Sequence, residues 1–292
     1  MVDTCVPWCL VLMIWGEKYS DKYVDTLVKS VKDHSRSCTH VVLITDRIRN
    51  RLSGDITQSL IPEFFNRPEF FKGGYPVKLS VFHKAVLPSD MPCVYIDLDT
   101  IVIGDVGVIA ALVTSLDAYY MLPPGNLVGF GWIRRWMHKK SGGANFATGN
   151  SSLVAFHSST IPNICEKFER LYKEGLKNDR KMKIDDVFIS WFAQQTLKKI
   201  PPSMAVMFRR EFLSRSRLVL EMKRRSPFIA RRRKGLVAVT FNGSQYKPEE
   251  FLAFKDGDKI FDEKNRFGVW DYKNLGDFKA KILQFAKAVT TG

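Results

Sequence analysis

Two aspartates at the end of a short apolar run are the most chemically informative feature of the sequence. Asp97 and Asp99 directly follow Cys93–Ile96 in the stretch C-V-Y-I-D-L-D-T-I-V-I. Residues two apart on an extended chain point to the same side, and two carboxylates that close repel each other unless a cation or hydrogen-bond donors compensate. Because hard divalent cations prefer oxygen ligands, the pair predicts a Mg²⁺ or Mn²⁺ site facing a diphosphate. The alternative is that the two aspartates only cap a turn at the end of a strand.

The surrounding sequence alternates strand and helix patterns, which is typical of a parallel α/β sheet. Val6–Trp15, 39–45 and Cys93–Ile96 are apolar runs that predict strands, and helical patterns follow Ser20 and Pro76. This β-α-β-α-β order predicts parallel strands with right-handed crossovers. In such sheets, ligands bind beyond the carboxyl ends of the strands. The segments at these ends are Trp15-Gly16, Asp46-Arg47 and Asp97–Asp99.

The remaining elements are predicted from the same patterns. Pro76 is a suitable first residue for a further helix, with Val77, Val81 and Ala85 on one face. Residues 123–143, which are rich in glycine and tryptophan, predict a loop. The other predicted elements are strands at Leu153–Phe156 and Leu236–Phe241 and helices at Ile161–Lys173, Asp185–Thr196 and Gly276–Ala288.

The positive charge of the chain is concentrated in two segments. The 292 residues carry 45 Lys and Arg against 30 Asp and Glu, a formal net charge of +15, and 45% are hydrophobic, which excludes a disordered chain. Residues 198–234 hold 13 Lys and Arg but only 2 acids. Residues 126–145 add four cations and no acid, so the rest of the chain is neutral overall. A local excess of this kind predicts a surface that meets a polyanion.

Cysteine usage and the N-terminal segment both indicate an intracellular protein. The cysteines lack C-x-x-C spacing, which predicts free thiols in a reducing compartment. They are Cys5, Cys9, Cys38, Cys93 and Cys165. The stretch Val6–Trp15 is too short to cross a bilayer and lacks a small-residue cleavage site. We therefore expect a cytoplasmic protein without a transmembrane segment.

Taken in order, these features resemble the nucleotide-sugar-dependent glycosyltransferases of the GT-A fold, and among them the glycogenin-like and bacterial lipopolysaccharide-sugar transferases. The resemblance covers residues 6–160 and 184–250 and depends on the order of several motifs. These are W-G-E-K-Y after the first strand, V-L-I-T-D, V-K-L-S-V-F, Y-I-D-L-D-T, T-G-N-S-S-L-V-A-F, I-D-D-V-F and F-N-G-S-Q-Y-K-P. It implies one α/β domain over 1–292: a Rossmann-type mixed sheet flanked by helices, with a nucleotide-sugar-binding half at 1–120 and a basic acceptor-side half at 121–292.

The resemblance also assigns roles to single residues. It implies a UDP-sugar as donor and Mn²⁺ or Mg²⁺ as cofactor, with Asp97 and Asp99 as metal ligands. The implied donor-binding residues are Trp15, Gly16, Tyr19 and Asp46 near the base, Lys78 and Lys247 at the phosphates, and Asp97, Asn150 and Ser151 at the ribose or sugar. The alternatives are a solvated helix residue for Lys78 and a polar turn for Asn150 and Ser151.

Two positions depart from the family pattern. Asp185 and Asp186 are the candidate catalytic residues, but the family usually has an amide where Asp186 stands, so a retaining or an inverting course stays open. Both acids also suit the start of a helix, where the dipole favours them. The family's third metal ligand is usually a histidine near F-x-G-x-x-K-P. Here Thr240 or Asn242 stands in its place, and Asn242 is the candidate ligand.

The two basic segments lie in the half that binds the acceptor in this family. Their cations alternate with aromatic residues, which suits a phosphate backbone with exposed bases. We therefore predict a polyanionic acceptor, with nucleic acid favoured over anionic lipid and a flipped-out hydroxymethylated DNA base as the acceptor group. The candidate acceptor-binding residues are Trp132, Arg134, Arg135, Trp136, Arg209, Arg210, Arg224, Arg225, Arg231 and Arg232.

Other classes of function are open alternatives. The first is a glycosyltransferase for lipopolysaccharide or another anionic glycolipid, because cations with Trp and Phe also suit a membrane surface. The second is a non-catalytic nucleic-acid-binding protein on a degenerate transferase fold, which the missing histidine favours and the Asp97–Asp99 motif opposes. A metal-dependent nuclease is the third, and it would make the order of the other motifs a coincidence. The remaining alternative for the basic segments is an ordinary solvated surface that binds no polyanion.

Overall fold

The structure divides into two units, each assembled from segments that are far apart in the sequence. The computed structural model describes residues 6–124, 136–137, 140, 142, 147–160, 162–241 and 246–290. The first unit comprises Met1–Lys18, Arg36–Ile96 and Gly107–Ile200. The second unit comprises Tyr19–Ser35, Asp97–Val106 and Pro201–Gly292. These boundaries do not follow the expected halves, 1–120 and 121–292, and the single domain stays a prediction.

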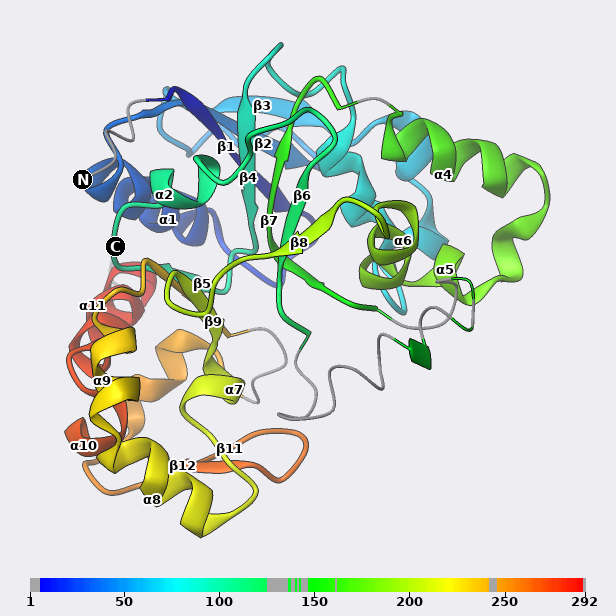
Figure 1. The fold of residues 1–292 in the computed structure, drawn as a ribbon. Coiled ribbons are helices and arrows are strands. Elements are labelled where there is room, and N and C mark those ends of the chain that lie inside the picture. The colour runs from blue at the N-terminus through cyan, green and yellow to red at the C-terminus, as the bar shows by residue number, and fades with distance from the viewer. Residues whose placement is uncertain are drawn as a thin grey trace. The chain divides into compact units, whose positions relative to one another are not determined.

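The first unit is built on a mixed sheet of seven strands among the described residues (Figure 1). In spatial order they are β3 (Thr57–Leu60), β2 (Cys38–Thr45), β1 (Trp8–Ile14), β4 (Pro92–Ile96), β7 (Asn150–His157), β6 (Tyr119–Leu122) and β8 (Leu197–Lys199). β3, β2, β1 and β4 run parallel, as the alternating pattern predicts. β7 is antiparallel to β4 and to β6, and β8 is parallel to β6. The predicted mixed α/β sheet is confirmed.

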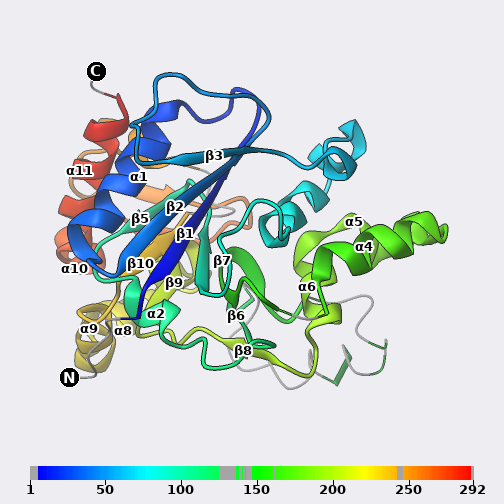
Figure 2. The same cartoon turned by 90° about the horizontal axis from the view of Figure 1, so that it is seen from above.

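The parallel register brings the ends of β1 and β2 to the same edge of this sheet. Ile14 pairs with Thr45, so Trp15 and Asp46 follow neighbouring strands. Figure 2 shows β3, β2 and β1 side by side in this part of the sheet. Every residue of β1 is buried, which is the environment that its continuous apolar run predicts for a parallel strand covered on both faces.

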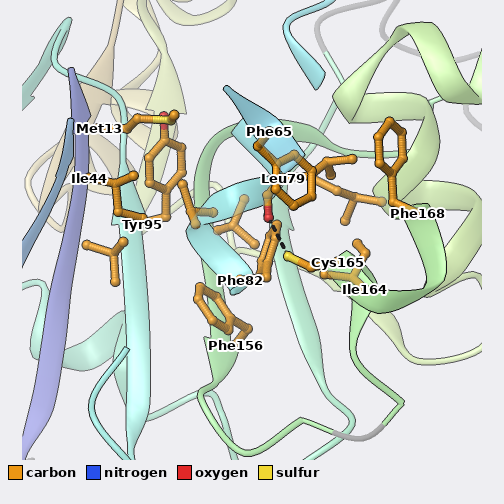
Figure 3. Packing of buried hydrophobic residues seen from close by; sticks show 14 of the residues in the cluster. Met13, Ile44, Phe65, Leu79, Phe82, Tyr95, Phe156, Ile164, Cys165 and Phe168 are labelled. Carbon is orange, nitrogen blue, oxygen red and sulfur yellow. Dashed lines mark hydrogen bonds between the residues drawn. The ribbon is translucent and has the colours of Figure 1, made fainter. Parts of the chain in front are cut away.

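An aromatic-rich core joins the sheet to α4 (Ile164–Lys173) and α6 (Asp185–Phe192) (Figure 3). The ring centroids of Phe82 and Phe156 lie 4.6 Å apart, and those of Phe168 and Phe188 lie 4.9 Å apart. Such edge-to-face pairs contribute about 0.5–1.5 kcal/mol each beyond burial. The Asn163 side chain caps the first turn of α4 by accepting hydrogen bonds from two backbone N–H groups. Aromatic packing therefore holds both helices against the sheet, and the Asn163 cap further stabilises α4.

Short helices fill much of the remaining first unit. The elements η1 (Glu63–Phe65), η2 (Pro68–Phe71) and η3 (Pro76–Phe82) are 3₁₀ helices between β3 and β4. The helix predicted after Pro76 does begin at Pro76, but it is a 3₁₀ helix that ends at Phe82, so Ala85 lies beyond it and is exposed. Within η3, all side chains except Lys78 are buried. A short helix buried on nearly every side has no amphipathic period, so the spacing of its valines was misleading. The other elements of this unit are α2 (Gly107–Ala110), η4 (Leu176–Asn178) and α5 (Arg180–Lys183).

The second unit contains a small sheet in the order β5 (Thr100–Val102), β10 (Ala238–Thr240) and β9 (Ala205–Met207), and a separate β11 (Lys259–Phe261)–β12 (Phe267–Val269) pair. Its helices are α1 (Asp21–His34), α7 (Phe208–Glu211), α8 (Arg217–Arg225), α9 (Pro227–Arg233), η5 (Pro248–Ala253), α10 (Tyr272–Leu275) and α11 (Phe278–Thr290). The rings of Phe208 and Phe241 stack at 4.5 Å, and those of Phe251 and Trp270 stack at 4.8 Å. This unit therefore has an aromatic core of its own.

Most of the predicted elements are present with shifted ends. β7 begins at Asn150 rather than at residue 153, and α6 ends at Phe192 rather than at residue 196. The loop predicted at 123–143 lies mostly outside the described residues. Among the described cysteines, all are free thiols, and only Cys38 is not fully buried. In the described part of the chain, every helix is too short or too polar to cross a bilayer.

Candidate functional site

Polar atoms of the first unit meet where β1 and β2 end. The Gly16 N–H donates a hydrogen bond to Asp46 Oδ2 at 3.0 Å. Gly16 has a left-handed φ of 59° and open space where a Cβ would lie. A side chain would strain this backbone, so glycine lets the chain turn beside Asp46. The structure thus brings these two predicted donor-site residues together, while their binding role stays a prediction.

Two arginines hold this turn in place: Arg47, which the sequence placed at the end of a predicted strand, and Arg49, which was not predicted. The buried Arg49 guanidinium donates to Asp46 Oδ1 at 3.2 Å, to the Gly16 carbonyl at 3.4 Å and to Thr45 Oγ1 at 3.1 Å. Arg47 donates to Asp46 Oδ2 at 3.3 Å. Bonds between charged groups are stronger than neutral ones. The Asp46 carboxylate is therefore fixed by two cations and one backbone N–H.

Trp15, on the other side of the turn, packs among aromatic rings. Its ring centroid lies 5.9 Å from that of Tyr75 and 6.1 Å from that of Phe71. Tyr75 is 44% exposed, has a φ of 54° and directly precedes η3, which carries Lys78. Trp15 is thus held by the segment that leads into the helix of Lys78.

A second polar cluster joins the start of α6 to the start of β7. Ser151 Oγ donates to Asp185 Oδ2 at 2.6 Å, and the Ser151 N–H donates to Asp186 Oδ1 at 2.6 Å. The Asn150 amide donates to Asp186 Oδ2 at 3.1 Å. Asp185, Asn150 and Ser151 are at most 7% exposed. All four residues were candidates on the sequence, and the structure brings them into one network, which we call the acid–amide cluster.

Burial dominates the ionisation of this cluster. It raises the pKa of Asp185 to about 7, with a further contribution from the neighbouring Asp186 carboxylate, while the charge of Lys78 and the Ser151 hydroxyl oppose the shift. Burial also raises the pKa of Asp186, against the bonds from Ser151 and Asn150. Helix capping was the alternative role for these acids. The residue before α6 is Ile184, and both carboxylates accept hydrogen bonds from β7, while Asp185 Oδ1 also accepts from the Asp186 N–H at 2.8 Å in the first turn of α6.

The second unit carries the predicted metal ligands. Asp97 and Asp99 are both partly exposed, while Leu98 between them is 3% exposed. This alternation agrees with two carboxylates on one side of the chain. Thr240 Oγ1 donates to Asp99 Oδ1 at 3.3 Å, and the Asp99 carbonyl accepts from the Phe241 N–H at 2.9 Å. The main chain at Asp99 is therefore anchored to β10 and the residue that follows it.

The residues present fit a hard divalent cation in part. Asp97 and Asp99 supply carboxylate oxygens, and the buried Thr100 Oγ1 has no hydrogen-bond partner among the described residues. In the described part of the chain, no group of three or more His, Cys, Asp or Glu could hold a metal. The predicted ligand Asn242 lies outside the described residues. A cation here would take its other ligands from a bound phosphate, from water or from that segment.

Tyr19 and Lys247, both predicted to bind donor, lie together in the second unit. Lys247 Nζ lies 5.3 Å from the Tyr19 ring centroid and 3.9 Å from Glu249 Oε1. Glu249 also bonds the buried Tyr23 hydroxyl, whose pKa is raised by its burial and then by Glu249. Tyr23 and Glu249 were not predicted. The only sequence signal for Glu249 is its place directly after the K-P motif.

Several predicted acceptor-binding arginines are held inside the second unit. Arg224 bonds Asp271 Oδ2 and Glu221 Oε1, each at 2.5 Å, and Arg232 pairs with Glu211. Burial would raise the pKa of Glu211, but Arg233 and Arg232 lower it more. Of the other candidates, Arg225, Arg231 and Trp136 are exposed, Arg209 and Arg210 are partly buried, and Trp132, Arg134 and Arg135 lie outside the described residues. The sequence alone therefore overestimated how many of these arginines are available to an acceptor, because their ion pairs form only in the folded chain.

Comparison with known proteins identifies the fold through structure alone. No protein-family profile matches the chain, and no curated protein matches its sequence. Solved structures that resemble it include the bifunctional glycosyltransferase WbbM, at 12% identity and a TM-score of 0.60 over 98% of this chain. The galactosyltransferase LgtC, solved with donor and acceptor sugar analogues, matches at 12% identity and a TM-score of 0.54 over 97% of both chains.

The glycosyltransferase GlyE of Streptococcus pneumoniae TIGR4 matches at 14% identity and a TM-score of 0.54 over 97% of this chain. This chain spans 50% of the WbbM structure and 64% of the GlyE structure. These three proteins are all glycosyltransferases. The chain therefore has the GT-A-like glycosyltransferase fold.

Proposed function

We propose that this protein transfers a sugar from a nucleoside diphosphate sugar to a hydroxyl group, with Mg²⁺ or Mn²⁺ as cofactor and a UDP-sugar as the expected donor. The observation that carries the proposal is the position of Asp97 and Asp99. They directly follow the buried strand β4 in a GT-A-like fold, and both side chains are partly exposed while Leu98 is buried. When bound, the cation would neutralise charge that develops on the departing diphosphate.

The other predicted residues have roles that suit the same reaction. Trp15 and Gly16 would hold the base, and Lys78 and Lys247 would pair with the phosphates. In the acid–amide cluster, a carboxyl with a pKa near 7 can hold or release a proton at neutral pH. Asp185 is therefore the proposed residue for proton handling at the sugar, and Asn150 would orient Asp186.

For the acceptor, a polyanion is the proposal that the sequence charge supports. A hydroxymethylated DNA base would need the cations of 198–234 to follow a phosphate backbone. Because Arg224 and Arg232 form ion pairs within the protein, fewer cations of this segment are available to a phosphate backbone than the composition indicated. Nucleic acid stays a prediction, and an anionic glycolipid is the alternative acceptor.

Donor-dependent thermal stabilisation tests the reaction class. A ligand that binds only the folded state at about 100 times its Kd adds about 2.7 kcal/mol of stability. We expect one nucleoside diphosphate sugar to raise the Tm of the full chain only when Mg²⁺ or Mn²⁺ is present. Asp99→Asn should abolish this shift. The matched control is Asp117→Asn, which changes an exposed aspartate of the first unit.

Hydrolysis of the donor without acceptor separates the enzyme from a non-catalytic binding protein. Slow release of the nucleoside diphosphate that stops in Asp99→Asn supports the transferase. Metal-independent binding of every donor, or undiminished hydrolysis by the variant, would contradict it. Transfer assays with hydroxymethylated duplex DNA and with an anionic glycolipid in vesicles then decide between the two acceptor classes.

A further inference from the structure

Helix α8 turns its large apolar side chains outward. Leu218 is 72% exposed, Met222 is 62% exposed and Val219 is 43% exposed, while Leu220 is the one fully buried residue of the helix. Leu218 and Met222 are four residues apart and so lie on one face of α8. A helix that packs on a protein normally buries such residues and exposes its charges.

Two of the four cations of the same helix, Lys223 and Arg224, turn inward. Lys223 Nζ donates to the Arg210 carbonyl at 2.7 Å and to the Leu213 carbonyl at 3.0 Å, and burial lowers the pKa of Lys223 to about 8. Arg224 is held by Asp271 and Glu221. The usual arrangement is therefore inverted in part: three large apolar side chains are exposed, while two cations are held inside by charge-assisted hydrogen bonds.

Helix α9 directly follows α8 in the chain (Figure 1, yellow) and also exposes a large apolar side chain. It begins after Ser226, whose hydroxyl accepts from the Ile229 N–H at 3.3 Å, and it presents Phe228 at 75% exposure. Its Arg232 and Arg233 point back to Glu211. No residue of α9 is fully buried. We call Leu218, Val219, Met222 and Phe228, with the exposed cations around them, the α8–α9 face.

Positive charge surrounds these apolar side chains. The exposed cations of this segment are Arg215, Arg217, Arg225, Arg231 and Lys234. All residues of 214–234 are described, and none of the exposed ones is acidic. The one acid, Glu221, is partly buried and paired with Arg224 and Arg225. Arg225 apart, the exposed cations have no ion pair with an acid of this segment, so the α8–α9 face combines exposed hydrocarbon with an excess of positive charge.

This combination selects the kind of partner. Aliphatic Leu, Val and Met side chains gain free energy only when they leave water for an apolar phase, and they cannot stack on bases as aromatic rings do. The surrounding cations gain from anionic headgroups at the same time. A bilayer surface offers both, with hydrocarbon directly beneath the charged headgroups. A nucleic acid offers the charge without the hydrocarbon.

We propose that the α8–α9 face docks the protein on a membrane surface that contains anionic phospholipid. Leu218, Met222 and Phe228 insert among the acyl chains, and the exposed arginines and Lys234 pair with phosphate groups. The proposal does not require sugar transfer, because its test measures binding to lipid without donor or metal.

Co-sedimentation of the full chain with vesicles tests the proposal. We expect binding to vesicles of phosphatidylcholine mixed with phosphatidylglycerol, little binding to phosphatidylcholine alone, and weaker binding as salt rises. Combining Leu218→Ser, Met222→Ser and Phe228→Ser should lower the partition coefficient at least about tenfold. Combining Arg217→Gln, Arg231→Gln and Lys234→Gln should lower it about a hundredfold, since each cation near an anionic surface contributes roughly a fivefold factor.

Matched controls come from the first unit. Leu60→Ser with Leu116→Ser changes two leucines that are 55% and 52% exposed, and Lys177→Gln with Lys183→Gln changes two exposed lysines. Both controls should bind like the wild type. Equal binding to neutral and anionic vesicles, or wild-type binding by the apolar variant, would overturn the proposal. The proposal would also be overturned if the protein bound duplex DNA and this binding were lost in the cation variant but kept in the apolar variant. It would be overturned as well if the protein were a dimer that only the apolar substitutions dissociated.

Discussion

The two acidic pairs of this protein are accommodated in opposite ways. Asp185 and Asp186 lie among donors from β7, and burial raises the pKa of both. Asp97 and Asp99 are partly exposed at the end of β4, and Asp99 accepts a longer bond of 3.3 Å from Thr240. The raised pKa values of the first pair reduce its charge within the fold, whereas the second pair is partly exposed to solvent. We propose proton handling for the buried pair and metal binding for the partly exposed one.

Neutralising Asp99 of the partly exposed pair should have the largest effect on activity and little effect on stability. We expect Asp99→Asn to lower kcat/KM for sugar transfer by about a thousandfold, since metal stabilisation of a transition state is worth several kcal/mol. The urea midpoint should stay close to that of the wild type, because a partly exposed carboxylate contributes little to stability. Steady-state kinetics and urea unfolding of the same preparation measure both. Wild-type activity would remove Asp99 from the proposed metal site.

The buried pair should reveal itself in the pH dependence of stability. The pKa of Asp185 is raised from 3.8 to about 7 in the folded chain. The folded state therefore holds the proton more tightly than the unfolded state, and the free energy of unfolding falls as pH rises from about 4 to about 7. The loss is on the order of 4 kcal/mol, at about 1.4 kcal/mol for each unit of pKa. Urea unfolding from pH 4 to pH 8 measures it.

The variant Asp185→Asn is the matched comparison for this pH dependence. An amide carries no titrating proton, so the variant should lose most of the fall in stability over the same pH range. It should therefore gain on the wild type as pH rises. A wild-type slope in the variant would show that another group titrates there.

Loss of one hydroxyl donor compares the two pairs directly. Ser151→Ala removes the donor to the buried Asp185, and we expect it to destabilise the protein by about 2 kcal/mol, because a buried acceptor without its donor is costly. Thr240→Val removes the donor to Asp99, and we expect less than about 0.5 kcal/mol, because water can replace it at a partly exposed carboxylate. Chemical denaturation of both variants measures the difference. Equal losses would mean that burial does not distinguish the pairs.

Local patterns in the sequence were sufficient to predict the partly exposed Asp97–Asp99 pair but not the hydrogen-bond partners of the buried pair. β1, β4 and the Asp97–Asp99 motif are read from neighbouring residues, so strand, exposure and spacing were predictable. The bond from Ser151 to Asp185 joins residues 34 apart, and that from Arg49 to Gly16 joins residues 33 apart. Such partners are set by strand register and helix packing rather than by local spacing. The family resemblance grouped Ser151 with Asp185, whereas nothing local pointed to Arg49.

The smallest expected effect concerns Lys78, whose charge lowers the pKa of both buried acids. In Lys78→Gln, the pKa of Asp185 should rise, so the fall in stability with pH should move upward by about half a pH unit, and less at high salt. Lys84→Gln is the control, since Lys84 is an exposed lysine close by that pairs with Glu166.

A second readout separates this electrostatic role of Lys78 from phosphate binding. If Lys78 also binds the diphosphate, the KM for the donor should rise in Lys78→Gln with little change in kcat, because the contact is equally strong before and during reaction. The pH shift needs no donor, so either effect can fail alone. If the KM for the donor rises while the midpoint of the pH dependence stays unchanged, Lys78 binds the donor but does not affect the ionisation of Asp185. The raised pKa values of the two acids would then be due only to burial and to the repulsion between their carboxylates.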